Sequence, residues 1–124
     1  MFQASVVIPA YNEAESVGET VKVIKDILDR YDIEAEILLI NDGSTDKTAI
    51  IAEDAGATVI NHKENMGYGV AIKTGIRKAR SKVIVITDAD GTYPVDRIPD
   101  LLHRMEETGA EMVVGARTGS RVRI

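Results

Sequence analysis

Hydrophobic residues gather in five short runs along the chain, at residues 5–8, 37–40, 58–60, 83–86 and 112–114. Valine and isoleucine dominate these runs, and polar residues do not alternate with them. This pattern is typical of strands that are buried on both faces of a parallel sheet. The runs therefore predict five β-strands.

Helical patterns fill the intervals between the runs. Apolar residues recur at spacings of four and three over residues 17–31, and a second apolar stripe covers residues 98–105. Residues 67–80 add small residues at one helical spacing, namely Ala71, Gly75 and Ala79. The alternation of strands and helices predicts an α/β fold with an open, mainly parallel twisted sheet and helices on both faces. At 124 residues, we expect residues 1–124 to form a single domain.

Polar residues follow four of the predicted strands, at residues 9–13, 41–42, 88–90 and 115–117. The carboxyl ends of parallel strands meet at one edge of a sheet. Open α/β sheets bind their ligands outside that edge, where the strand order reverses. The sequence therefore predicts one ligand site built from four separate strand ends.

Asp88 and Asp90 end the fourth predicted strand, with only Ala89 between them. Two carboxylates about 6 Å apart repel each other by roughly 3 kcal/mol at an effective dielectric constant near 20. A divalent cation reverses the sign of that interaction. Because Mg²⁺ typically takes one or two carboxylates, with water and substrate phosphates completing its shell, the pair is interpreted as half of a metal site.

A structural interpretation of the same residues stays open. Asp-x-Asp is a short pattern, and aspartate is common in turns because its side chain accepts hydrogen bonds from nearby backbone N–H groups. Asp42 fits a turn, Glu13 fits the first turn of a helix, and Arg117 fits a solvated cation near the end of the chain. What favours a shared site is their common position at one edge.

Three other segments have structural interpretations. Residues 42–45, "DGST", are expected to form a turn followed by hydroxyl caps for a helix. Gly67 and Gly69 are expected to form a turn. The alternative is that these glycines allow the N-terminus of the following helix to approach an anion. The histidines, His62 and His103, lack metal-ligand spacing and are expected to be structural or solvent-facing.

Residues 77–82, "RKARSK", are locally basic. We interpret them as a solvated helix end, because cations complement the negative end of a helix dipole. A phosphate contact from nearby Lys73 is the alternative.

The composition narrows the choice of partners. The net charge of −5 argues against nucleic acid as a partner and against a general anionic-membrane surface, although a local basic site for an anion remains compatible with it. The chain has no cysteine, so thiolate chemistry is excluded. We recognise neither a signal peptide nor a run of about 20 apolar residues, and we expect a cytoplasmic location, with contact at the cytoplasmic face of a membrane as an option.

Five segments together resemble a known family. They are "SVVIPAYNEAESV", "ILLINDGSTDKT", "NMGYGVAIKTGI", "VIVITDADGTYP" and "MVVGAR". In order and spacing they resemble the family-two inverting glycosyltransferases, and most of all the dolichol- and polyprenyl-phosphate sugar transferases. The resemblance implies the nucleotide-binding half of a glycosyltransferase A-type fold, with a UDP- or GDP-sugar at the strand ends.

The resemblance also implies roles for individual residues of the first two loops. Pro9, Tyr11 and Glu13 look like the first nucleotide-contacting loop. Ile40 and Asp42 look like the second, with Asp42 near the base or ribose.

The remaining implied roles concern the diphosphate. Asp88, Ala89 and Asp90 look like the Asp-x-Asp motif, with Asp90, alongside Asp88, holding Mg²⁺ or Mn²⁺ against the diphosphate while Asp88 contacts the nucleotide-sugar. Arg117 resembles an arginine that contacts the sugar phosphate or the acceptor.

The implied reaction is transfer of the sugar to a polyprenyl or dolichyl phosphate. Family members continue past this C-terminus, so the chain is expected to lack the acceptor-binding part and to self-associate through uncovered apolar surface. Two alternatives remain: a truncated, non-catalytic nucleotide-binding paralogue, and a receiver-like signalling domain. The second is disfavoured because "PAYNE" follows the first predicted strand, where a receiver needs an acid pair.

Overall fold

The computed structural model describes residues 2–91, 95–108, 112–115 and 120–123. Its elements in chain order are β1 (Ala4–Ala10), α1 (Val17–Arg30), β2 (Ala35–Asp42), α2 (Thr48–Ala55), β3 (Thr58–His62), α3 (Tyr68–Lys78), β4 (Ile84–Ile86), a 3₁₀ turn η1 (Val95–Arg97), α4 (Ile98–Thr108), β5 (Met112–Gly115) and β6 (Ser120–Arg123). Each of the five predicted strands is present.

The strands form one sheet in the order β3-β2-β1-β4-β5-β6. β1 pairs in parallel with both β2 and β4, so β2 and β4 point the same way. β3 and β5 extend the parallel sheet at its two sides. The predicted parallel α/β fold is confirmed, and the loops after β1, β2 and β4 meet at one edge.

The sixth strand was not predicted. β6 pairs antiparallel with β5 at the edge of the sheet. Its sequence alternates Arg121 and Arg123 with other residues and therefore lacks a continuous apolar run. Charged residues are common on edge strands because they discourage pairing with other chains.

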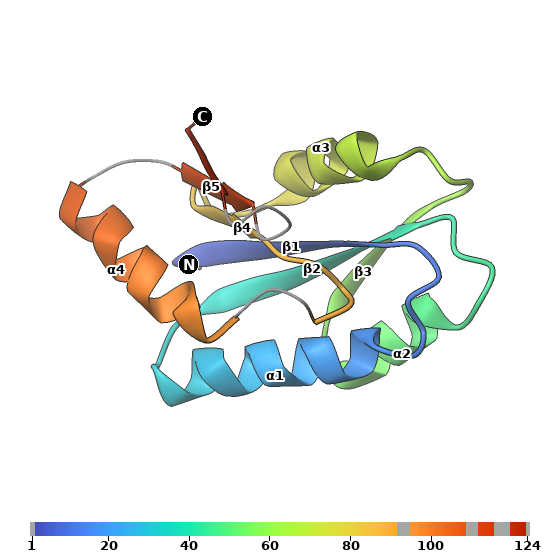
Figure 1. Ribbon diagram of the computed structural model, residues 1–124, viewed down its shortest axis with the longest axis horizontal. Helices are drawn as coiled ribbons and strands as arrows, with labels where there is room; N and C mark the ends of the chain where they lie inside the picture. The colour runs from blue at the N-terminus through green and yellow to red at the C-terminus, as the bar shows by residue number, and fades with distance from the viewer. Residues whose placement is uncertain (1, 92–94, 109–111, 116–119, 124) are drawn as a thin grey trace.

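Helices cover both faces of the sheet (Figure 1). α1, α2 and α4 pack on one face, over a core that includes Val6, Ile8 and Leu39. Of the described helices, α3 packs on the other face, over Val7 and Ile40. Neighbouring residues of a strand thus serve opposite cores, as the period of two requires.

α3 lies unusually close to the sheet. A Cβ atom added at Gly75 would lie 2.3 Å from Cγ1 of Val7, which real contacts do not allow. Ala71 beside it is fully buried. The small residues predicted along this helix therefore set its depth on the sheet. Among the described residues, no helix has both the length and the apolar character needed to cross a bilayer.

Candidate functional site

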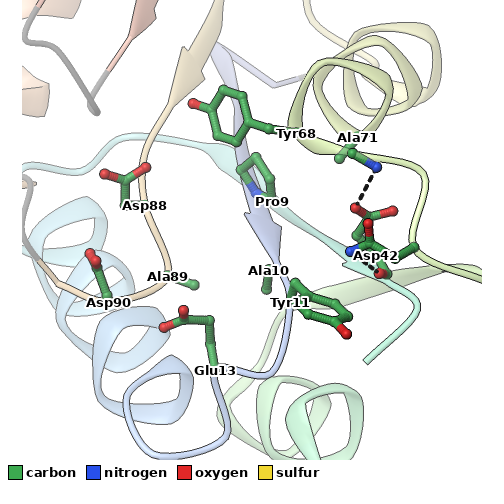
Figure 2. A pocket seen from close by; sticks show the side chains of 12 residues that line it. Pro9, Ala10, Tyr11, Glu13, Asp42, Tyr68, Ala71, Asp88, Ala89 and Asp90 are labelled. Carbon is green, nitrogen blue, oxygen red and sulfur yellow. Dashed lines mark hydrogen bonds between the residues drawn. The ribbon is translucent and has the colours of Figure 1, made fainter. Parts of the chain in front are cut away.

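A cavity of about 320 Å³ opens at the carboxyl edge of the sheet, between the ends of β1 and β4. At this point the strand order reverses, because β2 and β3 lie on one side of β1 and β4 lies on the other. The cavity is lined by Pro9, Ala10, Tyr11, Glu13, Asp42, Asn65, Gly67, Tyr68, Ala71, Asp88, Ala89 and Asp90 (Figure 2). Its size is at the lower end of the range for small-molecule sites.

The acidic loop after β4 is held in place by α1. Ser16 Oγ and Thr20 Oγ1 each lie 3.0 Å from the carbonyl oxygen of Ala89, to which they donate. Ala89 is buried, whereas Asp88 is half-buried and Asp90 is exposed. The loop backbone is thus fixed on the helix while both carboxylates line the cavity.

Glu13 lies across from this acidic loop (Figure 2). Its backbone N–H donates to Thr48 Oγ1 at 2.9 Å. Its Oε2 lies 3.1 Å from Ser16 Oγ, so the single hydroxyl proton of Ser16 is shared between Glu13 and Ala89. One serine therefore links the loops that follow β1 and β4.

Asn12 ties the loop after β1 to the loop after β2. It adopts a left-handed conformation with φ of 53°, which asparagine tolerates better than most residues. Its N–H donates to Ser44 Oγ at 2.9 Å, and its Oδ1 accepts from the N–H of Thr45 at 2.8 Å. These hydroxyl residues bind Asn12, so the expectation that they cap the following helix is wrong.

Asp46 supplies the contact at the start of α2. Its Oδ1 accepts from the N–H of Thr48 at 3.0 Å and from the Thr48 hydroxyl. The hydrogen bond from the Thr48 hydroxyl, with further backbone hydrogen bonds, outweighs partial desolvation and lowers the pKa of Asp46. Carboxylates at this position also suit the positive end of the helix dipole.

Asp42 is only 4% exposed, and its carboxylate anchors the segment that leads into α3. Oδ1 accepts from the N–H of Met66 at 2.8 Å, and Oδ2 accepts from the N–H of Gly67 at 3.0 Å. His62 Nδ1 lies 2.8 Å from the same Oδ1. Burial raises the pKa of Asp42, but the hydrogen bonds from His62, Met66 and Gly67 outweigh it, so the pKa lies below its ordinary value.

His62 continues this network into the body of α3. Its Nε2 lies 2.8 Å from Oγ1 of the buried Thr74. The chain Asp42–His62–Thr74 therefore joins β2, β3 and α3. His62 has the structural role that was expected, and His103 is solvent-facing, with its Nε2 2.8 Å from Glu107 Oε1.

The hydrogen bonds of Asp42 bear on whether Gly67 helps the N-terminus of α3 to bind an anion from outside the protein. Gly67 has φ of 102° and is the N-cap residue of α3. Its N–H already donates to Asp42, so a carboxylate of the protein occupies the position that the alternative gave to an outside anion. The predicted turn describes Gly67, whereas Gly69 lies in the first turn of α3 and its assignment to a turn before the helix is wrong.

Sequence reasoning missed the contribution of the β3–α3 segment to the cavity. Asn65, Gly67, Tyr68 and Ala71 line it alongside the predicted residues. Figure 2 shows the Tyr68 ring beyond Pro9, on the opposite side from Tyr11. The signal was the segment "NMGYGV", but placing Tyr68 needs the depth at which α3 packs, which the sequence pattern does not give.

Of the predicted site residues that the structure describes, Ile40 does not line the cavity. Ile40 is fully buried and packs with Val7 and Ala71 in the core beneath α3. The Ile40 side chain is thus part of the core, and the place of Ile40 in the second nucleotide-contacting loop stays a prediction. Arg117 lies outside the described residues.

The acidic pair suits a hard divalent cation. The described residues contain no group of three or more His, Cys, Asp or Glu side chains arranged to hold a metal ion. Asp88 and Asp90 offer two carboxylates beside an open cavity. Such a donor set fits Mg²⁺ or Mn²⁺, whose other ligands are water and substrate phosphate oxygens.

The fold and cavity define an open α/β protein with a cavity at the switch point of its sheet. The chain belongs to glycosyl transferase family 2, whose model matches residues 5–123. This membership agrees with the resemblance seen in the sequence and rules out the receiver-like alternative.

Among curated proteins, the chain is 38% identical over 113 residues to a dolichyl-phosphate hexose transferase of Haloferax volcanii. That match covers 91% of this chain and 47% of the transferase.

Solved structures of two further enzymes share the fold. Mannosyltransferase PcManGT from Pyrobaculum calidifontis, in complex with GDP-Man and Mn²⁺, matches with a TM-score of 0.63 and 26% identity over 77% of this chain and 30% of that one. Glucosyl-3-phosphoglycerate synthase from Mycobacterium tuberculosis, with Mn²⁺, UDP-glucose and phosphoglyceric acid, matches with a TM-score of 0.61 and 25% identity over 71% of this chain and 33% of that one. The chain thus spans less than half the length of these relatives.

Proposed function

We propose that this chain binds a nucleotide-diphospho-sugar together with a divalent metal ion, as the donor-binding part of an inverting glycosyltransferase that acts on a polyprenyl or dolichyl phosphate. The observation that carries the proposal is the meeting of three loops in one cavity. Tyr11 and Glu13, Asp42, and the pair Asp88 and Asp90 follow three different strands and line the same space.

The side of the cavity with Tyr11 and Asp42 suits the nucleoside. The Tyr11 side chain is 47% exposed and offers a ring face on which a base can stack. A carboxylate has about four lone-pair sites, and the N–H groups of His62, Met66 and Gly67 use three of those on Asp42. The remaining site, on Oδ2, is available to a base or ribose donor at the cavity wall.

The acidic side suits the diphosphate. Asp90, with Asp88, would hold Mg²⁺ or Mn²⁺, and Asp88 is also placed to contact the nucleotide-sugar. The bound ion would offset the negative charge that grows on the departing nucleoside diphosphate. Arg117 is proposed to contact the sugar phosphate or the acceptor through its planar, bidentate guanidinium group.

A lipid phosphate suits this site as the acceptor. Its oxygen is already anionic and needs little help from a general base. That oxygen forms a bond to the anomeric carbon as the bond to the diphosphate oxygen breaks on the opposite face, which inverts the configuration. The dolichyl-phosphate hexose transferase among the relatives supports this class of acceptor. An enzyme using it would work in the cytoplasm at a membrane face.

Calorimetric titration tests the donor site. GDP-mannose and UDP-glucose are titrated into the chain with and without Mn²⁺, and we expect binding that depends on the metal. Asp90→Ala should abolish the metal dependence. Asp26→Ala, which removes an exposed aspartate of α1 outside the cavity, is the matched control and should bind as the wild type does. Metal-dependent affinity that survives in Asp90→Ala would refute the metal assignment.

Incubation with a labelled donor and a polyprenyl phosphate then separates an enzyme from a non-catalytic paralogue. Product of inverted anomeric configuration supports the enzyme. Donor binding without product, under conditions in which the Haloferax transferase forms product, favours the nucleotide-binding paralogue.

A further inference from the structure

Residues 63–82 carry a strong local positive charge. This segment contains six basic residues, Lys63, Lys73, Arg77, Lys78, Arg80 and Lys82, and one acidic residue, Glu64, for a net +5. The whole chain has a net charge of −5, so the remaining residues sum to −10. The charge is thus divided between two parts of the molecule.

All six basic side chains are exposed. Within the part of the chain that the structure describes, none of them takes part in a salt bridge. Exposed apolar side chains lie among them: Met66 is 50% exposed, Val70 39% and Ile76 38%. The segment therefore presents a surface that is both cationic and apolar.

α3 directs this surface outward. Ala71, Thr74 and Gly75 are buried against the sheet, so the 100° step per residue places Lys73, Ile76 and Arg77 on the side of the helix away from the sheet, with Val70 on its flank. α3 also lies apart from α1, α2 and α4, which pack on the other face (Figure 1). We define the exposed side chains of residues 63–82 as the basic face.

We propose that the basic face binds the anionic headgroup surface of a lipid bilayer. Lys73, Arg77 and Lys78 lie on α3, which has 11 residues and is about 16 Å long, while Lys63 precedes the helix and Arg80 and Lys82 follow it, so the cations are spread out rather than converging on one point. That distribution suits a surface of many charges, whereas a single phosphate group would need converging donors. The interspersed apolar side chains suit the boundary between headgroups and acyl chains.

This inference rests on charge and exposure and does not depend on the proposed function. It also reconciles the acidic composition with membrane contact, because only one face needs to be cationic. The first residues of α3 line the cavity, so a bilayer on the basic face would lie beside the site. Such an arrangement suits an acceptor that is delivered from the membrane.

Vesicle sedimentation tests the proposal. The chain is mixed with phosphatidylcholine vesicles, with or without roughly 30% phosphatidylglycerol, since juxtamembrane cations respond to anionic lipid. We expect binding to the anionic vesicles alone, and its loss in about 0.5 M NaCl, where screening is strong. Each cation near an anionic bilayer contributes roughly fivefold to partitioning, so Lys73→Gln with Arg77→Gln should weaken binding about 25-fold.

A second double variant controls for the change in net charge. Lys22→Gln with Arg30→Gln removes one exposed lysine and one exposed arginine from α1, on the other face of the sheet. This pair should bind vesicles within about twofold of the wild type, because α1 lies beyond the Debye length of about 10 Å from the bilayer. The proposal would be overturned if the two double variants lost equal amounts of vesicle binding, if the wild type bound neutral and anionic vesicles equally, or if it bound no vesicles at all. Binding to polyglutamate but not to vesicles would also overturn it, in favour of an acidic protein partner.

Nucleotide-sugar titration keeps the two proposals separable. Lys73 and Arg77 do not line the cavity, so their double variant should bind the donor as the wild type does. If the wild type binds vesicles but not the donor, the proposed function is refuted and the proposal for the basic face is supported. If the wild type binds the donor but not vesicles, only the proposal for the basic face is refuted.

Discussion

Replacing Asp42 with asparagine tests whether its buried carboxylate organises the cavity. The substitution keeps the shape of the side chain but exchanges one oxygen for an NH₂ group and removes the charge. Oδ1 serves two donors, His62 Nδ1 and the Met66 N–H, whereas Oδ2 serves the N–H of Gly67. The amide oxygen should therefore take the Oδ1 position, and the NH₂ group should then face the N–H of Gly67.

The magnitude follows from those contacts. Two donors would meet at Gly67, and an unsatisfied buried donor costs about 1–3 kcal/mol. The contacts to Oδ1 would also change from charge-assisted to neutral hydrogen bonds, which are roughly half as strong. We expect Asp42→Asn to lower the free energy of unfolding by about 2–4 kcal/mol, a large share of the 5–15 kcal/mol typical of a domain.

Urea denaturation measures this loss. Asp54→Asn is the matched control, because Asp54 is exposed on α2, and its substitution should change the free energy of unfolding by less than about 0.5 kcal/mol. Donor affinity in Asp42→Asn should fall as well, because Gly67 and Tyr68 line the cavity. A loss as small as that of the control would refute the idea that this carboxylate holds the β3–α3 segment.

The same pair of proteins gives a pH signature. The pKa of Asp42 is lower in the folded chain than its ordinary value, so protonation favours the unfolded chain. The stabilisation is complete above the unfolded pKa and is lost as the pH falls through the folded value. The difference in stability between wild type and Asp42→Asn should therefore be constant from pH 7 to about pH 5 and should shrink below about pH 4. A difference that grows in acid would contradict the assignment.

Four further predictions concern the packing of α3, a buried hydroxyl, the donor site and self-association. Gly75→Ala should cost about 1–3 kcal/mol of unfolding free energy in urea titrations because its Cβ would collide with Val7, whereas Gly69→Ala, with open space around it, should be neutral or stabilising by up to about 1 kcal/mol. Thr87→Val should raise the unfolding midpoint by removing a buried hydroxyl that has no hydrogen-bond partner among the described residues, and an unchanged or lower midpoint would argue against this. Tyr11→Ala should weaken donor binding about tenfold in calorimetry through lost stacking, and an unchanged affinity would move the base elsewhere. Light scattering at high concentration should show self-association through exposed apolar side chains, which a purely monomeric peak would contradict.

The sequence was most informative where local patterns coincide with tertiary demands. Strands β1, β2 and β4 lie inside the sheet, so their apolar runs were continuous and easy to identify. β6 lies at the edge and carries arginines at alternate positions, so the same rule did not find it. The prediction for Ser44 and Thr45 went wrong because a hydroxyl near a helix start has several possible partners, and Asn12 is 32 residues away from the first of them.

The candidate site also has features that the sequence predicted and features that it did not. Parallel topology alone brings Glu13, Asp88 and Asp90 to one edge, so the sequence was enough to group them. The partners of Asp42 were not predictable, because His62 and Gly67 reach it only through the packing of β3 and α3 on β2. Ile40 shows the converse, since strand alternation directs its side chain into the core rather than into the cavity.

α3 connects the cavity, the buried network and the basic face, and its anchors should make them respond differently to substitution. Gly75 sets the depth of the helix on β1, and the Asp42 carboxylate fixes its first turn. Loosening the first turn of α3 displaces residues that line the cavity. The exposed cations keep their position, because the close contact at Gly75 still packs the rest of the helix on β1. Asp42→Asn should therefore weaken donor binding more than vesicle binding, whereas the double substitution of Lys73 and Arg77 should do the reverse. If both variants weakened both kinds of binding in equal proportion, α3 would not contain two separable surfaces.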